Sequence, residues 1–141
     1  MKQFVRYFSL FMAAVMLLAA PVFAAEPRGS DYIMSTCVYL TKGSGNQINI
    51  WHEVIARGLM TELGAAEIKV QETTVGQNWT TVEIITPSDE PSMTTENDIA
   101  YAASVSYTGV SGRYYRARII MFAENSSGRG EVATYTEPLK L

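Results

Sequence analysis

Alternation of apolar and polar residues is the main pattern along this chain after residue 36. Successive side chains of a strand point to opposite faces, so a period of two indicates a strand with one buried face. Turns rich in Gly, Asn, Ser and Pro separate the alternating segments. The pattern predicts seven strands, at 37–41, 47–56, 66–71, 79–85, 99–107, 113–124 and 131–139.

Two segments between these strands lack a clear period of two. Residues 57–64 continue an apolar spacing that also fits one short helix, but Gly58 and Gly64 favour a loop. Residues 87–98 are rich in Ser, Thr and acidic residues and predict a polar loop. Short strands joined by turns are typical of a single all-β, antiparallel β-sandwich. We expect this domain to cover 36–141, after a flexible entry segment at 25–35.

The first 24 residues follow a different pattern. Lys2 and Arg6 precede an apolar run from Phe8 to Ala20. Pro21 ends the run, and residues 22–24, with Val22 and Ala24 as the small residues, suit a cleavage site. This order predicts a signal peptide at 1–24 and a secreted, extracellular product. An uncleaved anchor is the alternative, because residues 7–25 approach the length that spans a bilayer. No second apolar stretch of that length follows, so we expect no membrane insertion after cleavage.

The charge of the chain narrows the choice of partner. Eleven Lys and Arg residues and 14 Asp and Glu residues give a formal net charge of −3 at pH 7. Cleavage removes Lys2 and Arg6 and no acidic residue, so the net charge of the mature protein becomes −5. Such a chain lacks the basic footprint of a nucleic-acid-binding protein and is unsuited to anionic lipid. We expect the partner to be an extracellular protein or a glycan, and no nucleic acid.

Residues with catalytic chemistry are few. Cys37 is the only cysteine and His52 the only histidine, so the one Cys–His pair available for nucleophilic catalysis is Cys37 with His52. We expect Cys37 to be a buried small apolar residue, and His52 to be a structural residue on the apolar face of its strand. The chain has neither a G-x-S-x-G motif nor a metal-ligand spacing. A small hydrolase is therefore the weakest hypothesis, and we expect no enzyme activity and no cofactor.

Acidic residues gather in the polar loop at 87–98. Carboxylate oxygens suit Ca²⁺, so a calcium-dependent cell-surface component is an alternative function. The loop lacks the alternating acids and central Gly of an EF-hand, and a solvated loop is the simpler expectation. The calcium hypothesis depends on Asp89, Glu90, Glu96 and Asp98.

The longest predicted strand, 113–124, carries the best candidate binding residues. One of its faces is small and apolar and is assigned to the core: Tyr115, Ala117, Ile119, Met121 and Ala123. The other face combines aromatic, basic and apolar side chains: Tyr114, Arg116, Arg118, Ile120 and Phe122. Because Tyr and Arg are enriched at binding hot spots, we hypothesise that this second face binds a ligand. The alternative is a covered sheet face whose arginines pair with Glu67 or Glu131.

The two tryptophans have different expected roles. We expect Trp79 to lie in the core. Trp51 is out of register with the apolar face of its strand, so it is a further candidate for packing on a partner or stacking on a sugar. Asn78 and Asn125 each begin an N-glycosylation pattern, but both also stand where Asn is favoured in a turn.

Residues 110–119 combine an apolar residue, a glycine, a tyrosine and an Arg-apolar pair: Val110, Gly112, Tyr115, Arg118 and Ile119. In this order they resemble the E–F corner of a fibronectin type III domain. Residues 123–130 resemble the hairpin after strand F, and 68–72 with 79–82 are similar to the C–C′ hairpin, although strand F is two residues longer than usual and the proline-rich exit of strand B is absent. The organisation of 31–137 also resembles a family of small exported proteins of Gram-positive bacteria with no assigned function. The resemblance implies a fibronectin type III-like, immunoglobulin-like sandwich and export, and it carries over no active site.

These features together predict a secreted, non-catalytic binding module that recognises protein or surface glycan through a sheet face or loops. Edge strands of a sandwich can pair between chains unless they are blunted. Pro138 and Lys140 blunt the end of the last predicted strand, and we therefore expect a monomer.

Overall fold

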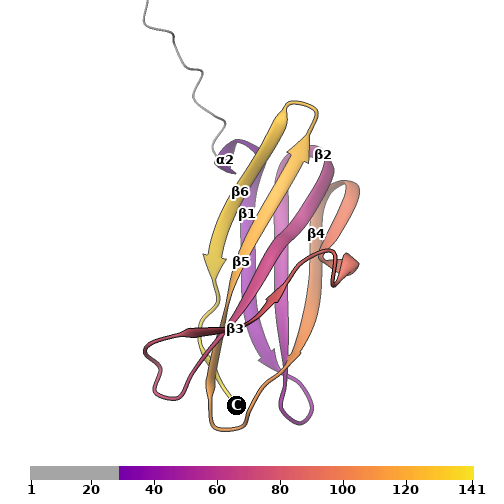
Figure 1. Cartoon of the computed structure of the whole chain (residues 1–141). Helices are drawn as coiled ribbons and strands as arrows, with labels where there is room; N and C mark the ends of the chain where they lie inside the picture. The colour runs from indigo at the N-terminus through magenta and orange to yellow at the C-terminus, as the bar shows by residue number, and fades with distance from the viewer. Residues whose placement is uncertain (1–28) are drawn as a thin grey trace, which may run out of the picture.

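A computed structural model describes residues 29–141 and contains one antiparallel sheet of seven strands (Figure 1). A one-turn helix, α2 (Gly29–Tyr32), leads into the sheet, and a 3₁₀ turn, η1 (Pro91–Met93), precedes the fourth strand. The strands are β1 (Ile33–Lys42), β2 (Gln47–Thr73), β3 (Thr80–Ile85), β4 (Thr94–Thr108), β5 (Tyr114–Asn125), β6 (Gly128–Tyr135) and β7 (Leu139–Lys140). The all-β, antiparallel prediction is confirmed. The predicted signal peptide and residues 25–28 of the entry segment lie outside the described residues.

Strand β2 organises the sheet because its 27 residues serve both halves. Its first half pairs with β1 on one side and with β4 on the other. Its second half pairs with β5 along the same edge that β1 occupies in the first half. Along the other edge, the second half pairs first with the start of β4 and then with β3. The loop expected at 57–64 is therefore wrong. The register of the β2–β4 pair shifts between Ile55 and Met60, and such an irregularity bends a strand without ending it.

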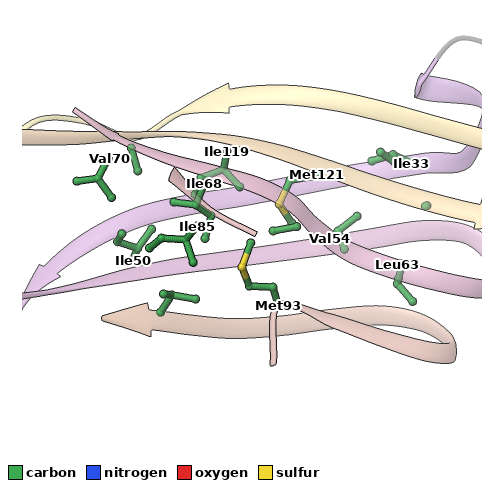
Figure 2. Close-up of a cluster of buried hydrophobic side chains, with 14 of the residues drawn as sticks. Ile33, Ile50, Val54, Leu63, Ile68, Val70, Ile85, Met93, Ile119 and Met121 are labelled. Carbon is green, nitrogen blue, oxygen red and sulfur yellow. The ribbon is translucent and has the colours of Figure 1, made fainter. Parts of the chain in front are cut away.

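The sheet is strongly curled, so that side chains from both halves of β2 meet in one core (Figure 2). Ile50 and Val54 come from the first half of β2, and Leu63, Ile68 and Val70 from the second. The predicted inner face of β5 is confirmed, because Tyr115, Ala117, Ile119, Met121 and Ala123 are fully buried. The structure shows a half-barrel made from a single sheet, and not two clearly separate sheets of a sandwich.

Three other element boundaries differ from the sequence prediction. The flexible entry segment expected at 25–35 is wrong for its described part, because α2 occupies Gly29–Tyr32 and β1 already begins at Ile33. The polar segment expected to run from 87 to 98 is shorter, because β4 begins at Thr94. The last predicted strand is divided: β6 ends at Tyr135, and the two residues of β7 then pair with β5. Between them, Thr136 is buried, and its backbone N–H donates to the carbonyl of Ala117. Within residues 29–141, no helix is long and apolar enough to cross a membrane.

Candidate binding face

The outer side of β5 presents the residues that the sequence singled out, with one exception. Tyr114, Arg116, Arg118 and Ile120 are half-buried and alternate with the core residues. Phe122 is only 2% exposed, because the guanidinium of Arg129 lies over its ring at 3.9 Å from the centroid. The hypothesis that Phe122 offers an accessible contact is therefore wrong. We call the outward side chains of β5 and of its paired strands β2, β6 and β7, together with Trp79 just before β3, the β5 outer face.

Arg116 is the centre of the β5 outer face. Its guanidinium carbon lies 4.5 Å from the centroid of the Trp79 ring and 4.8 Å from that of the Tyr135 ring. Its Nε donates a hydrogen bond of 2.8 Å to Oε1 of Gln71, the residue opposite it on β2. Within the described chain, no acceptor lies within hydrogen-bond distance of its two Nη groups. The side chain is therefore held in one orientation while most of its donors stay available.

The two rings beside Arg116 come from positions that the sequence did not mark as binding residues. Trp79 stands just before β3 and is half-buried, so the prediction of a core tryptophan is wrong. Tyr135 is the last residue of β6 and is 51% exposed. The period of two along β6 could have found Tyr135, because it shares the exposed face of this strand with Glu131 and Ala133.

Of the two arginines on β5, only Arg118 pairs with a carboxylate of the described chain, as the alternative of a covered sheet face expects. It lies 3.8 Å from Oε1 of Glu67, which Lys69 also contacts at 3.3 Å. The expected pairing with Glu67 is thus confirmed for Arg118. Glu131 pairs instead with Arg129, at 2.8 Å. Arg116 has no carboxylate partner among the described residues, and aromatic rings take that place.

Trp51 lies elsewhere in the molecule. It belongs to the first half of β2, where it stands between Tyr39 of β1 and Ser104 of β4. Its ring stacks on Tyr39, with centroids 5.9 Å apart and an interplanar angle of 23°. Because the sheet is curled around the core, this aromatic pair is on the outer side of the opposite half. The structure does not bring Trp51 together with the β5 outer face.

The only Cys–His pair in the sequence cannot act as a catalytic pair in this structure. Cys37 is exposed, so the expectation that it is buried is wrong. It stands opposite Glu53 in the β1–β2 ladder, whereas His52 stands opposite Val38. Neighbouring positions of a strand point to opposite faces, which places the thiol outside and the imidazole of His52 inside the core. The register therefore separates the two side chains.

The four carboxylates of the calcium hypothesis are separated as well. Asp89 accepts hydrogen bonds from the backbone N–H and the hydroxyl of Thr86, and this bonding lowers the pKa of Asp89. Glu90 accepts from the Ser92 hydroxyl, and Asp98 accepts from the backbone N–H of Ile99. In residues 29–141, no group of three or more potential metal ligands is close enough to hold an ion.

A solvent-open hollow of about 320 Å³ lies at the turn between β2 and β3. Most of the residues that line it carry hydroxyl or amide groups: Glu72, Thr73, Thr74, Val75, Gln77, Asn78 and Thr80. The one ionisable residue of the lining, Glu72, is already engaged by Arg113 and by the Tyr115 hydroxyl. The hollow therefore offers no group positioned for acid–base or nucleophilic chemistry.

No protein family, curated protein or solved structure matches this chain. The comparisons thus identify neither a fibronectin type III relative nor a family of exported proteins. Any function must be argued from the residues themselves.

The composition of the β5 outer face is typical of a recognition surface. It combines the aromatic rings of Trp79, Tyr135 and Tyr114 with the guanidinium of Arg116 and three further cations, Lys69, Arg118 and Lys140. The ammonium of Lys140 lies 5.2 Å from the ring centroid of Tyr114. Aromatic and arginine side chains contribute most of the binding energy in many protein interfaces. A cation on an aromatic face contributes further where water is excluded.

Proposed function

We propose that the protein is a secreted, non-catalytic binding module that recognises an extracellular protein or surface glycan through the β5 outer face. The single observation that carries the proposal is the stack of Trp79, Arg116 and Tyr135 on an accessible sheet surface. Secretion rests on the order of charged, apolar and small residues in 1–24.

A fibronectin type III-like arrangement of the strands belongs to the same proposal. It is supported by a local contact at the turn before β5. The backbone N–H of Val110 donates to the hydroxyl of Tyr115 over 2.7 Å, and the ring of Tyr115 is fully buried. A buried Tyr bonded to backbone a few residues upstream is typical of the corner between two strands of such sandwiches.

Pre-ordering of the side chains makes this face suitable for binding. A free arginine loses roughly 2 kcal/mol of rotamer entropy when a partner immobilises it. The two rings and Gln71 already restrict Arg116, so much of that entropy is lost on folding and not on binding. The same reasoning applies to Trp79 and Tyr135, which have only two side-chain torsions each.

The test begins with a panel of immobilised extracellular proteins and glycans. Each ligand that binds is then mapped by the changes it causes in backbone amide NMR shifts. We expect the changes to concentrate on β5, β6 and the start of β3. The double variant Arg116→Ala/Tyr135→Ala should weaken binding at least tenfold, since truncation of one hot-spot residue costs about 2 kcal/mol or more.

Two further variants make the test decisive. Lys42→Ala changes a cation at the end of β1, outside the β5 outer face, and should leave affinity unchanged. Trp51→Ala tests the rival surface on the other half of the sheet. Loss of binding with Trp51→Ala and not with the double variant would overturn the proposal, as would a panel in which no ligand maps to β5.

A further inference from the structure

The guanidinium of Arg116 has a specific set of unused donors. Arginine presents five N–H groups in a planar fork. The Nε–H donates to Gln71, and the guanidinium carbon lies over the rings of Trp79 and Tyr135. Four N–H groups remain on the two Nη atoms, with no acceptor in the described part of the chain. A fork held in this way is suited to a planar oxyanion bound by two parallel hydrogen bonds.

The surroundings of the fork favour a carboxylate, with one charge per group, over a ligand that carries several charges on each sugar ring. Lys69, Arg118 and Lys140 share the same outer face, and Glu67 neutralises part of their charge. The whole chain carries a formal net charge of −3. A ligand with several charges on each ring is therefore repelled by the rest of the molecule, whereas a ligand with one carboxylate per ring places a single charge at the fork, where the site is locally positive.

The aromatic rings indicate how the rest of the ligand is held. We propose that Arg116 is the carboxylate-binding centre for an acidic sugar of the uronic acid type, whose ring packs against Tyr135 or Trp79. This inference rests on the proposed function and names its ligand class. In a uronic acid the carboxyl carbon is attached directly to the sugar ring, so a ring stacked beside Arg116 carries its carboxylate to the fork. A glutamate side chain has to lose rotamer freedom to do the same.

The experiment measures binding by calorimetry at low and moderate salt. The probe is trigalacturonate, and three ligands serve for comparison: its methyl ester, a neutral galactose trisaccharide, and a triglutamate peptide with blocked ends. We expect trigalacturonate to bind at least tenfold more tightly than each of the others. Equal binding of the methyl ester or of the neutral sugar would contradict the proposed recognition of the carboxylate. Equal binding of the peptide would contradict the preference for a sugar ring.

Variants that each change one cationic side chain test whether the guanidinium of Arg116 binds the carboxylate. Arg116→Gln should weaken trigalacturonate binding at least tenfold, and Lys42→Gln, which removes the same charge elsewhere, should not weaken it. Arg116→Lys keeps the charge and loses the planar fork, so it should restore only a minor part of the affinity. Full rescue by Lys would overturn the proposed bidentate contact, and melting curves of all variants control for folding.

The experiments separate failure of the uronic acid inference from failure of the proposed binding function. If no uronic acid binds, but another ligand binds in an Arg116-dependent way and maps to β5, the inference fails and the proposed function stands. If ligands map only to the half that carries Trp51, both fail.

Discussion

His52 lies fully buried in the core, and neither of its ring nitrogens has a hydrogen-bond partner in the described structure. Buried polar atoms without partners cost roughly 1–3 kcal/mol each. Loss of solvation lowers the pKa of His52 below its usual value of 6.5, against a smaller opposing effect of the backbone at Met93 and Ile50. The imidazole is therefore neutral in the folded protein at neutral pH.

A pH-dependent loss of stability follows from this residue. The unfolded chain takes up a proton near pH 6.5, whereas the folded protein does so only at lower pH. Between these two values the unfolded state binds more protons, so the free energy of unfolding falls as the pH falls, by up to about 1.4 kcal/mol per pH unit. Urea titrations near pH 7 and near pH 5.5 measure the difference.

The variant His52→Leu removes both the titration and the unpaired nitrogens. We expect it to be more stable than the parent near pH 7 by about 1 kcal/mol, and to lose less stability between the two pH values. His52 is the only histidine, so no other imidazole contributes in this range. Parallel loss of stability in parent and variant would contradict the assignment.

At the scale of elements, the sequence pattern predicted β5 correctly and failed at the two glycines of β2. Alternation along 113–124 predicted β5 and its buried face correctly, because a regular strand keeps its period. Gly58 and Gly64 suggested a loop in a segment that is strand throughout. The period fails there because the β2–β4 register shifts after Ile55, and no local property of the sequence reveals which partner a strand bends around.

The candidate site was predictable to a similar extent. Arg116 and Arg118 followed from the alternation of β5, and Cys37 could have been placed outside by its alternation with Val38 and Leu40, which pack against the core. The burial of Phe122 depends on Arg129, seven residues further along the chain, and the role of Trp79 depends on Arg116. Contacts of this kind come from strand pairing and not from the pattern within one strand.

The two glycines should respond very differently to alanine. Gly64 has a φ of +147°, and a Cβ there would collide with the Met93 carbonyl and come within 2.7 Å of Thr94 Cα. Both obstacles are backbone, so we expect Gly64→Ala to cost about 3 kcal/mol. Gly58 has open space around it, and Gly58→Ala should change the free energy of unfolding by less than about 1 kcal/mol. Urea unfolding of both variants provides the comparison, and equal effects would contradict the close approach at Gly64.

At the scale of the whole molecule, the half-barrel is nearly closed between β1 and β6. No backbone ladder is found between these two strands in the described structure. Their facing side chains nevertheless meet, since the hydroxyl oxygens of Thr36 and Thr134 are 3.5 Å apart. Tyr32 of α2 is buried near Gly128 at the start of β6, where α2 lies beside this strand (Figure 1). The seam therefore depends on side-chain packing alone.

A covalent bond across the seam tests this closure. We expect Thr36→Cys/Thr134→Cys, in a Cys37→Ser background, to form a disulfide on oxidation of the folded protein. The closed loop spans most of the domain, so the oxidised form should be more stable than the reduced form by up to ~4 kcal/mol. Thiol titration shows whether the bond forms, and melting of the two forms measures the gain. The disulfide should leave ligand binding at Arg116 unchanged, because the fork lies on the outer side of the sheet. Free thiols after oxidation of the folded protein would show that β1 and β6 stand further apart than the contact between Thr36 and Thr134 implies.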